Sequence, residues 1–148
     1  MQAVIAILRV AVGVLLIVTG ALKVGHPGSF AASIADFRLL SPALIRPLAL
    51  FLPILEIGVG VYLVAGLFTR AAAIVAACQF ALYAGVIASA ILRGLPANCG
   101  CFGPADSAPA DWPHVLFDLA LTVIALLVAV FAPGILALDL RLRKSDEP

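Results

Sequence analysis

Four long runs of apolar residues, separated by short polar segments, dominate the hydrophobic pattern of the chain. Each run has about the 20 residues that an α-helix needs to cross the hydrocarbon core of a bilayer. The runs cover approximately Ala3–Leu22, Leu48–Leu67, Ala72–Leu92 and Val115–Leu138. The pattern therefore predicts an all-α integral membrane protein whose four spans form a transmembrane bundle.

The first apolar run is expected to stay in the protein as a span. Its first basic residue is Arg9, which lies well inside the run, and no A-x-A-like cleavage site precedes Lys23. A cleaved signal peptide would carry positive charge at its start and small residues at its end. We expect a single domain over residues 1–148, with a short charged cytoplasmic tail at 139–148.

The connection between the first two runs predicts a short amphipathic helix. Ser29 is a suitable N-cap, and apolar residues follow it on one helical face: Phe30, Ile34 and Phe37. Such a helix would lie in the membrane interface and cover the mouth of the bundle. Pro42 and Pro47 are expected to break the chain before the second span.

The third and fourth runs carry features that bear on packing. Small residues recur every four positions along the third run and predict a ridge that a neighbouring helix approaches closely: Ala73, Ala77, Ala81, Gly85 and Ser89. Simple alanine richness is the alternative explanation. In the fourth run, residues 133–134 are Pro-Gly, and we expect the helix to bend or fray there.

Composition supports a membrane location and argues against nucleic acid as a partner. The chain is 64% hydrophobic and 11% charged, whereas a soluble domain has about 25% charged residues. So few charges cannot cover a water-facing surface, so we expect the lipid bilayer to surround the chain. The formal net charge is +1, and the chain has no long basic run.

The distribution of basic residues gives only a weak prediction of topology. Four spans place both termini on one side, together with Arg70, Arg141, Arg143 and Lys144. The opposite side holds as many: Lys23, Arg38, Arg46 and Arg93. Arg9, if it snorkels toward the terminal side, favours cytoplasmic termini under the positive-inside rule. We expect a multi-pass protein of the bacterial inner membrane, with the loop between the third and fourth spans in the periplasm.

That loop contains two cysteines, Cys99 and Cys101, separated only by Gly100. A disulfide between them would close a very small and strained ring, and strain makes a disulfide easier to reduce. So short a loop gains little stability from a cross-link. The spacing favours reversible redox chemistry, with an inert local disulfide and a soft-metal site as alternatives. The third cysteine, Cys78, lies too far inside the third run to reach the pair and is expected to pack as a small apolar residue.

Residues that could activate these thiols are expected near the same membrane face. Positive charge favours the reactive thiolate, and the basic candidates are Lys23, His26, Arg38 and Arg93. His114 and Asp118 share one helical face at the start of the fourth span. The Asp118 carboxylate would orient the imidazole, and His114 would take a proton from Cys99 or Cys101. The alternative is an interfacial histidine with no role in exchange.

Glu56 is the clearest charge inside a predicted span, one turn after Pro53. A carboxyl group in hydrocarbon is costly, so it must be neutral or paired. Arg9 is the expected partner, and Lys23 is less favoured because it lies at the opposite end of the first span. Glu56 is either a proton acceptor for thiol oxidation or an interhelical hydrogen-bonding group, and both interpretations stay open.

Over nearly its whole length the chain resembles the MauE family (methylamine utilisation), within the wider DoxX-like group of small four-helix membrane proteins. The resemblance rests on several short motifs: Gly20-x-x-Lys23 with Pro27 and Phe30, Ile34-x-x-Phe37-x-Leu39-Leu40 with Pro42, Leu52-Pro53-x-x-Glu56, and Cys99-Gly100-Cys101-Phe102-Gly103 after Arg93-Gly94. The last string is the most specific of them.

The resemblance implies thiol–disulfide chemistry at the outer membrane face and a thioredoxin-like partner. It also implies a role in maturing disulfide-rich extracytoplasmic proteins such as the methylamine dehydrogenase small subunit. The sequence offers one usable thiol pair and no nucleotide or haem motif, so we expect exchange with an external thioredoxin-like domain. A quinone bound among the spans stays open. The rival functions are a Cu(I)- or Hg(II)-binding membrane protein and a non-catalytic scaffold for a redox partner.

Overall fold

The structure is a computed structural model that describes residues 1–98 and 109–132. Its helices are α1 (Gln2–Gly25), α2 (Pro27–Asp36), α3 (Pro42–Ala65), α4 (Thr69–Leu92) and α5 (Trp112–Phe131). All but α2 are long and apolar enough to cross a membrane. In these described ranges the only β-structure is an isolated bridge. The prediction of an all-α bundle of four spans, with a short helix between the first two, is confirmed.

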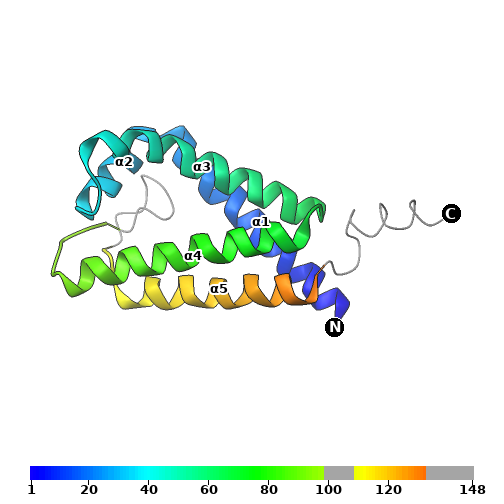
Figure 1. Ribbon diagram of the computed structural model, residues 1–148. Coiled ribbons are helices and arrows are strands. Elements are labelled where there is room, and N and C mark those ends of the chain that lie inside the picture. Colours follow the sequence, from blue (N-terminus) through cyan, green and yellow to red (C-terminus); the bar gives the residue numbers. More distant parts are fainter. Residues whose placement is uncertain (99–108, 133–148) are drawn as a thin grey trace.

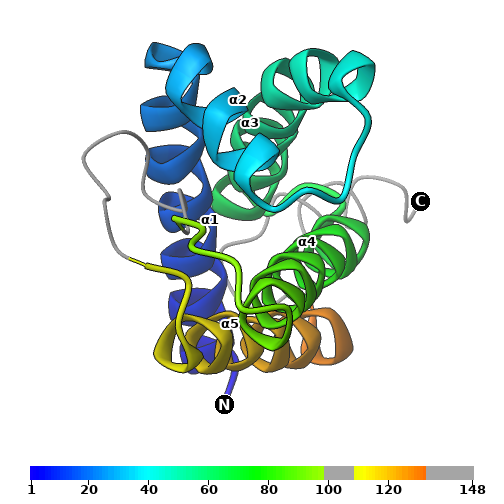
Figure 2. The same ribbon diagram turned by 90° about the vertical axis from the view of Figure 1, so that its left-hand side faces the viewer.

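The spans form two helix pairs that pack against each other. The most extensive contacts join α4 to α5 and α1 to α3, and Figure 1 shows α4 and α5 lying side by side along their whole length. The short helix α2 lies across one end of the bundle, where α1 ends and α3 begins (Figure 2). The end of α4 and the start of α5 lie at this end too, so α2 and the described residues that flank the cysteine loop belong to the same end of the bundle.

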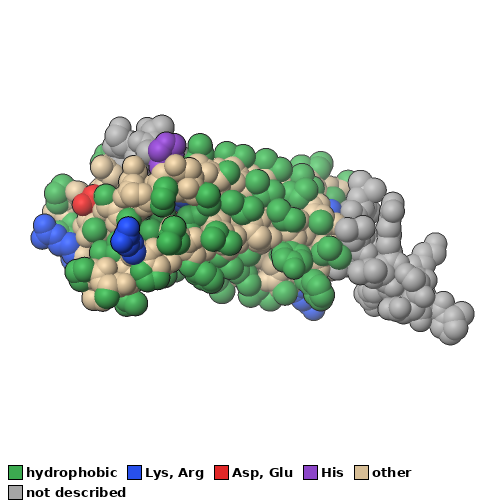
Figure 3. All heavy atoms as spheres, turned by 90° about the horizontal axis from the view of Figure 1, so that it is seen from above, with side chains coloured by type: hydrophobic (Ala, Val, Ile, Leu, Met, Phe, Trp, Pro, Cys, Tyr) green, Lys and Arg blue, Asp and Glu red, His purple; other side chains and the backbone are tan. Residues whose placement is uncertain are grey.

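The surface of the bundle is what a lipid environment requires. Hydrophobic side chains cover the length of the molecule in Figure 3, whereas the Lys and Arg side chains of the described residues lie mostly toward its two ends. Exposed apolar residues occur on every span, for example Ile7, Ile54, Leu82 and Val123. A soluble monomer rarely exposes so continuous an apolar surface, so these residues face lipid.

Close contact between α1 and α3 depends on glycine. A Cβ atom added to Gly60 would lie 2.6 Å from the Gly13 carbonyl oxygen and 2.8 Å from Ile17 Cγ1. A Cβ atom added to Gly13 would lie 2.8 Å from the Gly60 carbonyl oxygen. The two backbones therefore touch at a pair of facing glycines, which is how small residues bring transmembrane helices together.

Replacement of Gly60 by alanine should force α1 and α3 apart. Because the new methyl group would meet backbone rather than a flexible side chain, we expect a loss of about 1–3 kcal/mol in stability. Thermal unfolding in detergent measures this loss. Gly58→Ala on the same helix is the matched control, because nothing lies within 4 Å of its added Cβ atom. Equal melting temperatures for the two variants would contradict the proposed contact.

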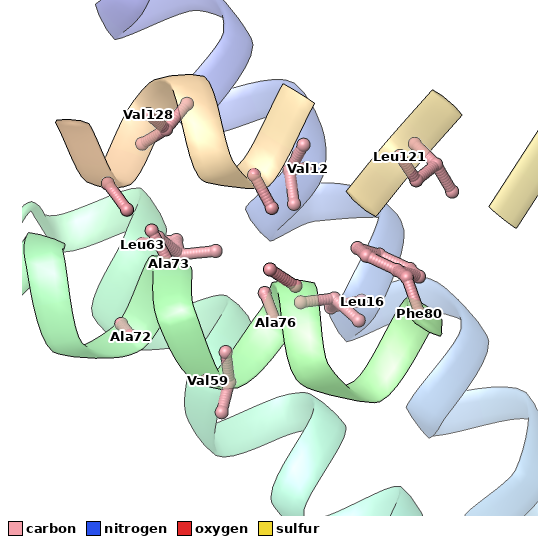
Figure 4. Close-up of a cluster of buried hydrophobic side chains, with 13 residues drawn as sticks. Val12, Leu16, Val59, Leu63, Ala72, Ala73, Ala76, Phe80, Leu121 and Val128 are labelled. Carbon is pink, nitrogen blue, oxygen red and sulfur yellow. The ribbon is translucent and has the colours of Figure 1, made fainter. Parts of the chain in front are cut away.

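A core of buried apolar residues joins all four spans (Figure 4). Leu16 of α1, Leu63 of α3, Phe80 of α4 and Val128 of α5 are each at most 4% exposed. Small alanines of α4 fill the space between these larger side chains: Ala72, Ala73, Ala76 and Ala77. Helix α4 therefore contributes more residues to this core than any other span.

The predicted small-residue ridge on α4 is only partly correct. Ala73 and Ala77 are buried, but Ala81 and Gly85 are exposed. Four residues turn an α-helix by more than a full turn of 3.6 residues, so a strict four-residue spacing drifts around the helix. The buried face instead continues through Phe80, Ala84 and Ile87.

Three helix starts differ from the predicted ones because of local chain chemistry. Helix α3 begins at Pro42 and continues through Pro47, so these prolines do not break the chain as expected. Pro42 fits the first turn of a helix, where its missing N–H has no partner to lose, whereas Pro47 lies inside the helix. Helix α2 begins at Pro27 with His26 as its N-cap, so Ser29 lies inside the helix instead of capping it. Helix α5 begins at Trp112, ahead of the expected Val115.

Candidate functional site

A cluster of polar side chains is buried between α1, α3 and α4. We call it the buried polar cluster and define it as Thr19, Lys23, Glu56 and Tyr83. Glu56 is 0% exposed and accepts three hydrogen bonds. Lys23 Nζ donates to Oε1 over 2.7 Å, and the Tyr83 hydroxyl donates to the same oxygen over 2.5 Å. Thr19 Oγ1 donates to Oε2 over 3.4 Å. The Gln79 amide donates to the Tyr83 hydroxyl over 3.2 Å. Each carboxylate oxygen therefore has a described partner.

The cationic partner of Glu56 is Lys23, and the prediction of Arg9 was wrong. A helical side chain points back toward the N-terminus of its own helix, so the long Lys23 side chain reaches the level of Gly20. A Cβ atom on Gly20 would lie 3.1 Å from Glu56 Cβ, which shows that α3 places Glu56 at that level. Arg9 is itself buried, at 2% exposed, so the expectation that it snorkels toward the terminal side was wrong.

Burial makes this ion pair energetically important. Lys23 is 2% exposed, and its ammonium also lies 5.2 Å from the Phe30 ring centroid and 5.0 Å from the Tyr83 ring centroid. Such cation–π contacts add to the attraction of the carboxylate. Removing one member of a buried pair leaves the other charge uncompensated, which is far costlier than removing both. Glu56 thus acts at least as an interhelical tie between α1, α3 and α4.

A double-mutant cycle should reveal this coupling. We expect Glu56→Gln and Lys23→Met each to destabilise the protein by about 3–5 kcal/mol, because each leaves one buried group unpaired. The double variant should recover a large part of that loss. Thermal unfolding in detergent is the measurement, with Asp36→Asn on the exposed face of α2 as a control expected to stay within about 0.5 kcal/mol. Additive losses would contradict a coupled pair.

The loop that carries the two cysteines is closed at its base. The Ala110 N–H donates to the Ala97 carbonyl over 2.9 Å, and Asn98 pairs with Pro109 in an isolated antiparallel bridge. The predicted site residues Cys99, Gly100, Cys101, Phe102 and Gly103 lie outside the described residues, as do residues 133–148 with the predicted Pro-Gly bend and charged tail. The described residues place the two ends of the cysteine segment beside the start of α5.

Arg93 has a structural partner at this end of the bundle. Its guanidinium Nη2 donates to the Phe37 carbonyl over 2.6 Å, and Nε donates to the Ser89 carbonyl over 3.0 Å. The side chain thereby ties the end of α4 to the end of α2. Of the basic groups expected to assist the thiols, Lys23 is likewise held, by Glu56.

His114 is oriented by Asp111, and the predicted orienting role of Asp118 was wrong. Nδ1 of His114 lies 2.5 Å from Asp111 Oδ1, and the same oxygen accepts the His114 backbone N–H over 3.1 Å. Asp111 is the N-cap of α5, a position where aspartate is favoured. Two hydrogen bonds from His114 lower the pKa of Asp111: the one from the imidazole ring has the larger effect, and the one from the backbone N–H has the smaller. The sequence signal for this Asp111–His114 contact is an aspartate three residues before a histidine at the start of a helix.

Loss of the Asp111 cap should loosen the first turn of α5. Asp111→Ala should speed amide hydrogen exchange there, whereas Asp111→Asn keeps a capping side chain and should have a much smaller effect. Because the pKa of Asp111 is lowered by folding, its contribution is complete above the ordinary aspartate value of about 3.9 and is lost only as pH falls through the lowered value. Unchanged exchange in Asp111→Ala would contradict the capping role.

Asp118 faces a small cavity that it shares with the buried polar cluster. The cavity has a volume of about 30 Å³, and among its lining residues are Lys23, Glu56, Tyr83, His114 and Asp118. Asp118 is 6% exposed, and its Oδ2 atom has no hydrogen-bond partner among the described residues. A cavity of this volume has room for one water molecule. The three predicted residues Glu56, His114 and Asp118 therefore meet at one cavity.

Sequence reasoning missed some residues of this site and misplaced another. Thr19, Gln79 and Tyr83 were not predicted, although Gln79 and Tyr83 stand one helical turn apart in an otherwise apolar run, which is a detectable signal. Cys78 was expected to pack inside, but it is exposed on α4. Within residues 1–98 and 109–132, no group of three or more His, Cys, Asp or Glu residues is placed to hold a metal ion.

Four apolar helices around buried, paired charges define a small multi-pass helical membrane protein. The chain belongs to the MauE family: the family described as methylamine utilisation protein MauE matches residues 1–131. It is 34% identical over 128 residues to the methylamine utilization protein MauE of Paracoccus denitrificans, covering 86% of this chain and 69% of that protein. It is 35% identical over 109 residues to the protein of the same name from Methylophilus methylotrophus, covering 72% of this chain and 57% of that protein. No solved structure matches the chain.

Proposed function

We propose that this chain is a membrane thiol–disulfide exchange protein that serves methylamine utilisation. In this proposal Cys99 and Cys101 pass redox equivalents to or from a periplasmic thioredoxin-like partner. That exchange supports the maturation of a disulfide-rich extracytoplasmic protein of the methylamine dehydrogenase type. The observation that carries the proposal is the Cys-Gly-Cys sequence in a loop whose closed base adjoins Asp111 and His114.

The exchange step needs no oxidant beyond the partner itself. A thiolate of the reduced member attacks the disulfide of the other, a mixed disulfide forms, and the second thiol of the attacking pair releases it. Two electrons and two protons move between the pairs, so one dithiol becomes a disulfide while the other disulfide becomes a dithiol. The direction follows the relative reduction potentials of the two pairs.

His114 is suited to handle the proton of an attacking thiol. When Nδ1 carries a proton and donates to Asp111, Nε2 is left as an acceptor. The His114 side chain is 23% exposed, so protons can reach it from the aqueous side. The small cavity behind it leads to Asp118 and Glu56, which supports Glu56 as a proton acceptor in addition to its role as an interhelical tie.

We propose the bacterial inner membrane as the location, with cytoplasmic termini and a periplasmic cysteine loop. The start of α1 and the end of α5 lie at the same end of the bundle, opposite α2 (Figure 1). Disulfides persist in the periplasm and are rare in the cytosol, which supports placing the end with α2 and the cysteine loop outside.

Single cysteine variants should trap the partner covalently. Cys99→Ser or Cys101→Ser leaves one thiol that forms a mixed disulfide but cannot resolve it, so non-reducing gels should show an adduct that dithiothreitol removes. The double variant should trap nothing, and Cys78→Ser should behave like the native protein. In intact cells, an impermeant thiol reagent should label the reduced pair and spare Cys78.

Other outcomes would select another function. If neither single variant traps a partner and the native pair resists reduction across about −120 to −270 mV, the range of catalytic disulfides, the pair is an inert local disulfide. If the dithiol holds Cu(I) tightly and never oxidises, the protein is a soft-metal binder. Labelling only in opened cells would overturn the periplasmic placement.

A further inference from the structure

A second, larger cavity lies beneath α2, between α3 and α4. Its volume is about 310 Å³, at the lower end of the roughly 300–1,000 Å³ range of small-molecule sites. Its walls are apolar side chains of α2, α3 and α4, including Ile34, Leu52 and Val86. Leu82 also lines it and is 55% exposed on a membrane-spanning helix, so the cavity opens toward lipid.

The floor of this cavity is polar and electrically balanced. Lys23 and Tyr83 are its polar lining residues, and both contact Glu56. An ammonium group has three N–H donors, and Lys23 gives one described hydrogen bond, to Glu56. The lysine can therefore donate to a further acceptor. Because Glu56 already balances its charge, the floor favours an uncharged acceptor over an anionic head group such as a lipid phosphate.

We propose that this cavity binds the head group of an isoprenoid quinone. A quinone is an uncharged planar ring with carbonyl oxygens that accept hydrogen bonds, and its apolar tail belongs in lipid. The ring lies between the apolar walls with one carbonyl toward Lys23, and the tail leaves past Leu82. Each part of the ligand thus meets a part of the cavity with matching polarity.

The small cavity on the other side of the floor strengthens this assignment. Lys23 and Tyr83 line both cavities, and Asp118 and His114 line the smaller one. Reduction of a quinone consumes two electrons and two protons and yields a quinol. An apolar pocket needs a route for those protons, and the water-sized cavity supplies one from the side of His114. A pocket that binds only a structural lipid would not require a proton route through the smaller cavity.

The redox role of this site rests on the proposed thiol function. The dithiol loses two electrons and two protons and becomes a disulfide, while the quinone gains them and becomes a quinol. The quinone is then the terminal acceptor that lets a single cysteine pair oxidise successive partners. Binding itself depends only on the cavity and does not require the cysteines.

Cavity-filling variants test the site. The full chain in nanodiscs is photolabelled with an azido-ubiquinone analogue that carries a ten-carbon tail, and labelled peptides are mapped by mass spectrometry. Val86→Trp fills the cavity from α4 and should weaken labelling by about tenfold or more. Val75→Trp is the matched control, since it makes the same change on an exposed position of α4 that lines neither cavity. Ile34→Trp fills the cavity from α2 and keeps the test decisive if Val86→Trp does not fold.

The outcomes separate this inference from the proposed function. The Cys99→Ser/Cys101→Ser variant should bind the analogue as the native protein does, although it traps no partner. Normal partner trapping, combined with equal labelling of the filled and control variants, would overturn the quinone site alone. Competition by excess phospholipid as effective as that by unlabelled decylubiquinone would show that the cavity is a lipid site and would also overturn it.

Discussion

The need to keep a carboxylate charged inside a membrane governs this structure. Glu56 is completely buried in α3, and its charge is tolerable only because Lys23, Tyr83 and Thr19 converge on it. These partners come from α1 and α4, so a single carboxyl group links three of the four spans. In hydrocarbon, where unpaired charge is strongly disfavoured, such a link specifies how the helices must be arranged.

The ion pair in turn requires close backbone contact. Lys23 reaches Glu56 because α1 and α3 touch at Gly13 and Gly60, with Gly20 facing Glu56 farther along. Larger residues there would separate the helices and lengthen the contact between the charges. The glycines and the ion pair therefore depend on each other, because close packing of α1 against α3 allows Lys23 to reach Glu56.

Two members of the same polar cluster, Lys23 and Tyr83, line two cavities of different size. On one side is the apolar cavity beneath α2, and on the other is the water-sized cavity that Asp118 and His114 line. The wall that the two cavities share consists of Lys23 and the Tyr83 hydroxyl, and both groups are bonded to Glu56. Both cavities therefore lie toward the end of the bundle that carries α2 and at which the cysteine loop begins and ends.

The sequence by itself determined the class and the elements of this protein. Span length, apolar composition and the amphipathic stripe at Phe30, Ile34 and Phe37 are local properties, so they predicted four spans and the interfacial helix. It also identified Glu56, because a charge inside an apolar run is visible without any structure. Only the tertiary structure decided the partner of Glu56. Lys23, and not Arg9, contacts Glu56 because of the direction of the Lys23 side chain along α1 and the way in which α1 packs against α3. Likewise, spacing suggested Asp118 for His114, whereas the cap geometry of α5 selected Asp111 and left Asp118 facing a cavity. Pairings and cavities arise where separate helices meet, and periodicity along one helix carries no information about that meeting.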